Sequence, residues 1–367
     1  CKYANSLMKR NASEVMDLSS CTWMVRELGE AVSCTVLLDD DALLVGGWDG
    51  TIKHWSEAGD LIWEAKTPNR ISSMVVQDGA IYATSGLHIV CLAASTGEIQ
   101  WDIALEGSAD AVMSTGNCVL AASSVYDIEH NDFIESAIWS ISFNGDVLAT
   151  HRMDERPWTL HPYNQGAIAG LGRPLNGYLI LDANGGILEQ NKDWESPTIC
   201  ATNGENPVFG LADGSIRSMD GTLVGSMKSA ISNVVKHAGG YLLADDEGGI
   251  EFVEDDTRWN ANGNEVVALS LGFDIDETGS CWVARWNGSQ GEVIVHSIID
   301  GEAIASLSGQ RVHDMAFNGK RIAVGCENGQ VFVWEKELFQ RRLQQPPQQQ
   351  NDASRSAMFE KLRSLRK

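Results

Sequence analysis

A short pattern that recurs along the chain constrains the fold more than any other feature. In each copy a glycine is followed by a short strand-like segment, as in residues 59–63 and 97–101. The copies are about 40 residues apart, and a period of this length is typical of proteins built from repeats. A degenerate copy near Trp259 fills the one gap that is twice as long. The glycines that open the clear copies are Gly59, Gly97, Gly145, Gly185, Gly221 and Gly301.

A second pattern, an apolar strand that ends in a tight turn, lies just upstream in each unit. Asp49 with Gly50 and Asn328 with Gly329 form such turns. These pairs are strong hairpin signals because both central residues need a positive φ. Four short strands per unit are typical of a propeller blade. The units begin near residues 32, 71, 109, 157, 197, 231, 265 and 311. We therefore predict an all-β, eight-bladed β-propeller, with a seven-bladed ring as the alternative.

The last unit lacks a fourth strand, and a segment near the N-terminus can supply it. The strands end after residues 331–334, where a helical segment begins, whereas residues 21–28 are strand-like and belong to no unit. We expect residues 21–28 to complete the last blade, because this removes a free edge strand. Two units carry insertions, at residues 125–136 and 272–280, which we expect to form surface loops.

The part of the chain after residue 338 differs in composition from the rest. We divide the chain into an N-terminal extension (1–20), the propeller (21–338), a Gln/Pro-rich linker (339–353) and a basic amphipathic helix (354–367). An isolated helix this short is marginal in water, so we predict that it folds against a protein partner. A fold-back onto the acidic ring and a solvated end are the alternatives. The predicted partner-binding residues are Met358, Phe359, Leu362, Arg363, Leu365 and Arg366.

The acidic composition argues against two classes of partner. The net charge is −23, and such a surface repels nucleic-acid phosphates and anionic lipids. No apolar run approaches the ~20 residues of a membrane span, so we expect neither nucleic acid nor membrane as a partner. The cysteines form no Cys-x-x-Cys pair and mostly lie in apolar runs, which favours a reducing, cytoplasmic compartment. Cys1 at the first position supports the alternative of a periplasmic lipoprotein with lipid on that residue.

One segment resembles the repeat of quinoprotein-like propellers, which reads roughly Leu-Asp-Ala-x-Thr-Gly-x-x-x-Trp. Residues 92–101 keep its Thr, Gly and Trp, with Ala93 in place of the usual Asp. Residues 50–55 and 329–334 are similar instead to the third strand of WD40 repeats. The resemblance implies a propeller closest in architecture to eight-bladed, non-enzymatic rings. In such rings the repeat Trp packs between blades. We accordingly assign structural roles to Trp55, Trp63, Trp101 and Trp334.

The sequence offers little support for catalysis, so we predict no cofactor and favour a protein that is not an enzyme. Quinone-dependent dehydrogenases of similar fold carry an adjacent Cys-Cys pair that this sequence lacks, and it contains no Gly-x-Ser-x-Gly elbow or P-loop. Asp274, Asp276 and Thr278 echo the first ligands of a calcium loop, but Arg285 stands where such a loop needs Glu. An acidic, solvated loop is therefore the alternative to a metal site there.

These observations favour a non-catalytic propeller scaffold that mediates protein–protein interaction. A hydrolase or lyase with a composite site at the channel mouth is the first alternative, because residues from different blades can converge there. A lipid-anchored periplasmic assembly scaffold is the second. Since fold alone does not determine function, the choice depends on what the surface of the ring presents.

Overall fold

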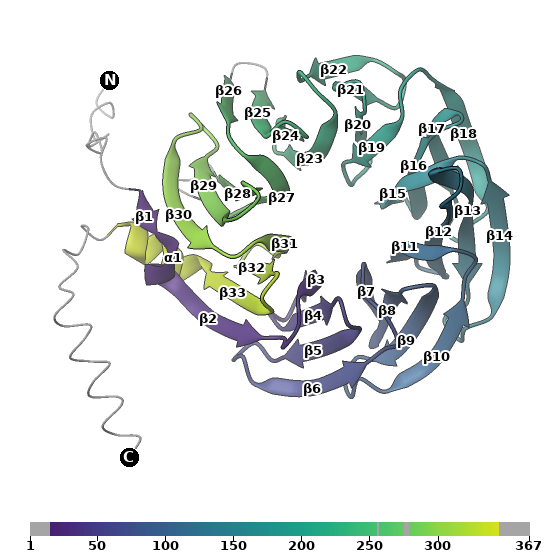
Figure 1. Ribbon diagram of the computed structural model, residues 1–367, viewed down its shortest axis with the longest axis horizontal. Helices are drawn as coiled ribbons and strands as arrows, with labels where there is room; N and C mark the ends of the chain where they lie inside the picture. The colour runs from purple at the N-terminus through teal and green to yellow at the C-terminus, as the bar shows by residue number, and fades with distance from the viewer. Residues whose placement is uncertain (1–14, 255–256, 275–278, 345–367) are drawn as a thin grey trace.

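The computed structural model shows eight β-sheets arranged as the blades of a ring. Figure 1 shows the blades placed radially around a central axis, with the first strand of each blade innermost. This confirms the eight-bladed propeller and excludes the seven-bladed alternative. The structure describes residues 15–254, 257–274 and 279–344.

Blades 1 to 4 follow one another along the chain, each with four antiparallel strands. Blade 1 consists of β3 (Val32–Leu37), β4 (Leu43–Gly47), β5 (Thr51–Trp55) and β6 (Leu61–Lys66). Blade 2 consists of β7 (Met74–Gln77), β8 (Ala80–Ser85), β9 (His88–Ala93) and β10 (Ile99–Ala104). Blade 3 consists of β11 (Ser108–Ser114), β12 (Val119–Asp127), β13 (Asp132–Ile141) and β14 (Val147–Met153). Blade 4 consists of β15 (Arg156–Tyr163), β16 (Gly166–Gly172), β17 (Asn176–Leu181) and β18 (Ile187–Trp194).

Blades 5 to 8 repeat this order, and the last blade takes one strand from the N-terminal part of the chain. Blade 5 consists of β19 (Thr198–Ala201), β20 (Val208–Leu211), β21 (Ser215–Ser218) and β22 (Leu223–Ser226). Blade 6 consists of β23 (Ile231–His237), β24 (Gly240–Asp245), β25 (Gly249–Glu254) and β26 (Thr257–Asn262). Blade 7 contains β27 (Glu265–Leu271), β28 (Ser280–Trp286), β29 (Gly291–Ser297) and β30 (Ala303–Gly309). Blade 8 consists of β31 (Val312–Phe317), β32 (Arg321–Cys326), β33 (Gln330–Glu335) and β2 (Thr22–Glu27).

The N-terminal segment closes the ring, as predicted for residues 21–28. β2 pairs antiparallel with β33 and forms the outermost strand of blade 8. Just before it, β1 (Met16–Asp17) pairs in parallel with β30 at the outer edge of blade 7, and a 3-10 helix (Leu18–Cys21) joins β1 to β2. The two ends of the ring thus share a blade, and opening the ring requires breaking the β2–β33 ladder.

A short helix, α1 (Lys336–Leu343), follows β33 and packs against blades 7 and 8. The side chain of Glu335 caps it by accepting hydrogen bonds from the backbone N–H groups of Glu337 and Leu338. Phe339 is fully buried and contacts the rings of Phe273 and Trp282. The helix therefore crosses the predicted boundary at residue 338 and is packed as part of the propeller. Within the described parts of the chain, no helix is both long and apolar enough to span a bilayer.

The core lies between neighbouring blades. Middle strands such as β4, β16 and β32 are buried at every residue, because a blade covers each of their two faces. Their sequences are accordingly near-continuous runs of apolar and small residues. Outermost strands such as β18 are largely exposed. The blades are thus held together mainly by the apolar side chains of their inner three strands.

The antiparallel strand order gives the disc two distinct faces. Loops between the second and third strands lie on one face, together with the links between blades, and we call this the BC face. Loops between the first and second strands lie on the opposite AB face. The insertion at residues 125–136 lies on the BC face, where the sequence suggested a loop. It is instead a β-hairpin in which β12 and β13 pair as far as Asp127 and Asp132, with one register shift between Val125 and Tyr126. Of the insertion at residues 272–280, the described residues 272–274 and 279–280 lie at the ends of β27 and β28 on the AB face.

Candidate functional site

Only one of the three proposed calcium ligands lies in the described part of the chain. The Asp274 carboxylate forms an ion pair with Lys336 Nζ at 2.7 Å, and its backbone oxygen accepts a hydrogen bond from Gln340 at 2.8 Å. Both contacts connect this loop to α1. Asp276 and Thr278 lie outside the described residues, as do the partner-binding residues predicted in the C-terminal segment. In the three described ranges, no group of three or more His, Cys, Asp or Glu side chains is placed to hold a metal ion.

Trp63 and Trp101 each reach from an outermost strand to the following blade. Trp63 Nε1 donates a hydrogen bond to the oxygen of Ala94 at 2.8 Å, and Trp101 Nε1 donates to the oxygen of Phe143 at 3.0 Å. The repeat glycine makes room for the indole: Gly97 has φ +73°, and a Cβ there would lie 2.4 Å from the Trp63 ring. These contacts couple adjacent blades.

The other repeat tryptophans are also in the interior. Trp259 donates from Nε1 to the oxygen of Ile298 at 2.6 Å, so the degenerate copy in blade 6 makes the same contact. Trp334 is fully buried and donates to the oxygen of Leu18 in the 3-10 helix at 3.0 Å. Trp55 is buried between blades 8 and 1. The indoles of Trp259, Trp334 and Trp55 are therefore packing groups of the interior.

Burial makes the described cysteines poor nucleophiles. Desolvation raises the pKa of Cys281 and Cys326 to about 12 and that of Cys91 to about 11. Since only the thiolate attacks or binds metal, thiols with such pKa values are packing groups at neutral pH. The seven cysteines in the described residues are all free.

Exposed apolar side chains on the loops are concentrated on the BC face of blades 1 to 4. Most other exposed large hydrophobic residues lie on outermost strands, where single apolar residues at the surface are ordinary. On the described BC face of blades 5 to 8, no large hydrophobic side chain is comparably exposed. The exposed large hydrophobic residues on the BC face of blades 1 to 4, which we call the apolar arc, are Trp48, Leu87, Tyr126, Ile128, Ile134, Trp158 and Leu175.

The β12–β13 hairpin carries three members of the apolar arc away from the ring. Ile128 at its turn is 86% exposed. The turn is well ordered by its own polar groups, because Asp127 accepts hydrogen bonds from the backbone of Glu129 and His130. The Tyr126 hydroxyl donates to Asn131 Oδ1 at 2.6 Å. Apolar side chains are thus held outward on a defined hairpin instead of packing against the ring.

An arginine links this hairpin to the next blade. The Arg156 guanidinium lies 3.6 Å from the centre of the Phe133 ring and 3.9 Å from that of Trp158. Phe133 belongs to β13, whereas Arg156 and Trp158 begin the innermost strand of blade 4. A guanidinium between two aromatic rings is a favourable cation–π arrangement. It fixes the base of the hairpin against blade 4 and orients the exposed Trp158.

A second aromatic–arginine pair occurs at the junction of blades 1 and 2. Trp48 lies in the β4–β5 turn and is 45% exposed. The Arg70 guanidinium is 3.7 Å from the centre of its ring, and the His313 ring from blade 8 is 5.8 Å away. Burial lowers the pKa of His313, and the nearby cations Arg311 and Arg70 lower it further. The imidazole is therefore neutral at physiological pH.

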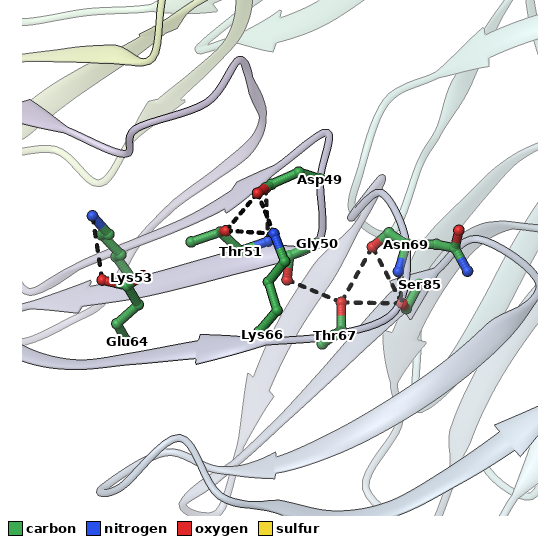
Figure 2. A network of polar contacts seen from close by, with 9 residues as sticks. All are labelled: Asp49, Gly50, Thr51, Lys53, Glu64, Lys66, Thr67, Asn69 and Ser85. Carbon is green, nitrogen blue, oxygen red and sulfur yellow. Dashed lines mark hydrogen bonds and ion pairs between the residues drawn. The ribbon is translucent and has the colours of Figure 1, made fainter.

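A polar network fixes the backbone on either side of this pair (Figure 2). Asp49, directly after Trp48, pairs with Lys66 and accepts a hydrogen bond from Thr51 Oγ1 at 2.9 Å. Thr67 Oγ1 donates to the oxygen of Gly50 at 3.1 Å and accepts from Ser85 Oγ at 3.0 Å. Ser85 Oγ also accepts from the backbone N–H of Asn69, the neighbour of Arg70, at 3.2 Å. The turn of blade 1, the blade link and blade 2 are therefore tied together.

Two pockets lie away from the apolar arc. One of about 420 Å³ is lined by the innermost strands of blades 4 to 6, including His161, Cys200, Asn233 and Lys236. Burial lowers the pKa of His161 and raises that of Cys200 to about 12, so the thiol in this pocket is not activated. The other, of about 310 Å³, lies between β14 and β18 on the outer side of the ring.

The residues of the apolar arc and their arginines were not predicted from the sequence. Exposure depends on which side of each blade a turn faces, and this is not visible in a repeat pattern. One signal was present: Trp48 stands between Gly47 and Asp49 in a tight turn, a position that usually favours small or polar residues.

Comparisons with known proteins agree with the architecture. Residues 14–155 match the family described as outer membrane protein assembly factor BamB. No curated protein sequence matches the chain. The crystal structure of Sqt1 from Saccharomyces cerevisiae aligns with a TM-score of 0.68 and 11% identity, over 86% of this chain and 98% of that one. BamB from Moraxella catarrhalis aligns with a TM-score of 0.66 and 13% identity, over 86% and 99% of the two chains.

A third similar structure is the computationally designed protein Ika8, with a TM-score of 0.61 and 17% identity over 84% of this chain and 98% of that one. The family match covers less than half of the chain, and the structural matches at these identities establish the fold alone. The protein is thus a β-propeller that combines quinoprotein-like and WD40-like features, as the repeat motifs indicated.

Proposed function

We propose that this propeller is a non-catalytic scaffold that binds a partner protein through the apolar arc on the BC face. The observation that carries the proposal is the concentration of exposed Trp, Tyr, Ile and Leu side chains on one part of one face. Clusters of this kind on a folded surface mark interaction sites. Trp, Tyr and Arg are also the residues that dominate the binding energy of protein interfaces.

The order of this surface adds support. The Asp49 network, the hairpin turn and the stacked Arg156 hold the exposed rings in place before any partner arrives. A preformed surface loses little conformational entropy on binding. Each aromatic ring can bury about 150–250 Å², so a few of them supply a large part of a standard interface.

The C-terminal segment is proposed as a second point of attachment for the same or another protein. Its residues Met358, Phe359, Leu362 and Leu365 would form one apolar face beside Arg363 and Arg366. Because α1 runs to Leu343 and buries Phe339, a chain shortened for this test should end at Gln344. Retention of a partner by the full chain and not by the shortened one supports this role. Equal retention by both would remove it.

Two proposals can be made for the compartment in which the protein works. The buried, free thiols suit a reducing cytoplasm. The match to an outer membrane assembly factor favours a second candidate, a lipid-anchored assembly scaffold in the periplasm. Metabolic labelling of the full gene product with a radioactive fatty acid separates the two, because only the second places lipid on Cys1.

Matched surface variants test the binding proposal. One carries Ile128→Ser, Ile134→Ser and Leu175→Ser on the apolar arc. The control carries Leu61→Ser, Leu148→Ser and Leu188→Ser on outermost strands, where the side chains are similarly exposed. In affinity capture from native lysate, we expect a discrete protein to be retained by the wild type and the control and lost by the arc variant. Equal retention by all three chains would place the interface elsewhere.

A further inference from the structure

Three arginines occupy equivalent positions around the central axis on the BC face. Arg70, Arg156 and Arg311 each directly precede the first buried residue of an innermost strand region, in blades 2, 4 and 8. Those buried residues are Ile71, Pro157 and Val312. The same position is Ala31, Ser108, Pro197, Ala230 and Glu265 in the other blades. A chain with a net charge of −23 thus presents three guanidinium groups around one end of its axis.

Each of these guanidinium groups lies over an aromatic ring. The distances to ring centres are 3.7 Å for Arg70 over Trp48 and 5.4 Å for Arg311 over Trp286. Arg156 lies between two rings, as described above. Stacking covers the faces of a guanidinium group and leaves its N–H edge available. The three arginines are therefore held in place with their hydrogen-bond donors unused by the rings.

These donors are also unused by the rest of the described protein. The side chains of Arg70, Arg156 and Arg311 form no hydrogen bond or ion pair with any residue in the described ranges, and the buried Nε atoms of Arg156 and Arg311 are without an acceptor. Arg321 differs from these three arginines. Its guanidinium lies 4.0 Å from the centre of the Trp23 ring, but it also donates hydrogen bonds to the backbone oxygens of Asp41 and Glu57. The structural role of Arg321 uses its donors, whereas the three BC-face arginines keep theirs free.

No carboxylate in the described ranges forms a direct ion pair with these three guanidinium groups. Asp110 is the acid that most influences Arg156, but its oxygens already accept hydrogen bonds from Ser108 and Ser124. Glu327 lies near His313, and it forms no ion pair with Arg311 among the described residues. Free guanidinium donors beside exposed rings match a ligand with both carboxylate and apolar groups, because the planar guanidinium fork binds a carboxylate through two hydrogen bonds.

We propose that the BC face binds an acidic, apolar peptide segment of its partner. Carboxylates of the segment pair with Arg70, Arg156 and Arg311, and its apolar side chains pack on the exposed rings of Trp48 and Trp158. This inference rests on the proposed scaffold function and names the chemistry of the partner. A nucleic acid offers anions too, but its uninterrupted phosphate charge meets a strongly acidic protein and the carboxylates Asp127 and Glu129 on the neighbouring hairpin.

The test uses the full chain and a defined probe. The probe is a short fluorescein-labelled peptide built from a Glu-Leu-Gly repeat, followed by fluorescence anisotropy. Comparison peptides carry Lys or Gln in place of Glu, and a single-stranded oligonucleotide of equal charge serves as a second comparison. Protein variants are Arg70→Gln, Arg156→Gln and Arg311→Gln, singly and together. The charge-matched control is Arg152→Gln, an exposed arginine on β14 that is paired with Glu106.

We expect the Glu peptide to bind, the Lys and Gln peptides to bind at least tenfold more weakly, and each BC-face substitution to weaken binding by about tenfold. The control variant should bind as the wild type does. Equal binding of the Glu and Lys peptides, undiminished binding by the triple variant, or tighter binding of the oligonucleotide would each overturn the inference. If the triple variant still captures the protein partner while the apolar-arc variant does not, the scaffold function stands and only the acidic-peptide assignment fails.

Discussion

Replacing Asp314 with Asn should reduce the pH dependence of stability. Asp314 lies on β31 of blade 8, and its Oδ2 accepts a hydrogen bond from the backbone N–H of Thr35 in blade 1 at 2.6 Å. Burial raises the pKa of this carboxyl from 3.8 to about 7. Asn keeps an oxygen that can accept from Thr35 and carries no charge at any pH.

The sign follows from proton binding. Because the pKa of Asp314 is higher in the folded than in the unfolded chain, the folded chain binds more protons between these two pKa values. The free energy of unfolding therefore falls as the pH rises from about 4 to about 7 and loses no more above that. At about 1.4 kcal/mol per pKa unit, this loss is ~2 kcal/mol between about pH 5.5 and pH 8.5. Contact of the side chain with water makes the loss smaller, so we expect about 1–2 kcal/mol.

Urea unfolding followed by tryptophan fluorescence measures this difference. We expect Asp314→Asn to gain about 1–2 kcal/mol over the wild type as the pH is raised across that window. Asp60→Asn, at an exposed position on an AB-face loop, is the control and should track the wild type. A constant difference between Asp314→Asn and wild type at every pH would refute the account of this junction.

Three further predictions concern packing. Gly97→Ala should lower the free energy of unfolding by about 2–4 kcal/mol, because a Cβ there would meet the Trp63 ring and φ is positive. The control is Gly221→Ala, where φ is similar but the space around the Cβ is open. It should lower the free energy of unfolding by only about 1 kcal/mol in the same urea titration. Phe339→Ala should lower the free energy of unfolding by about 3–5 kcal/mol, because it leaves a cavity under α1. A decrease below 1 kcal/mol in thermal or urea unfolding would contradict the buried position of that ring. Cys281 and Cys326 should resist iodoacetamide in the native protein and react after unfolding; rapid native labelling, mapped by mass spectrometry, would show that they are accessible.

The sequence was sufficient to predict the ring and its closure. The turn pairs and repeat glycines are local signals, since a positive φ at Gly97 or Gly50 is required wherever the turn occurs. The starts of the eight units therefore fell within a few residues of β3, β7, β11, β15, β19, β23, β27 and β31. Closure by β2 followed from counting strands, because a ring with one missing strand and one spare strand has a single economical pairing.

The candidate site could not be predicted in the same way. Trp48 and Arg70 belong to different blades, and their contact depends on the angle between those blades. Phe133 and Trp158 meet Arg156 only because the insertion is a hairpin that leans toward blade 4, whereas its sequence suggested a loop. An alignment of the first strands of the units would have shown the repeated arginine, but its free donors become evident only once all neighbouring acceptors are placed.

A photo-crosslinking amino acid at position 128 tests the central claim most directly. Ile128 is the most exposed member of the apolar arc, and Leu188, 67% exposed on β18, is the control position. We expect irradiation of native cells to link the chain to one discrete protein from position 128 and not from position 188. A product of the same mass from both positions, or from position 188 alone, would contradict the assignment of the BC face as the docking surface.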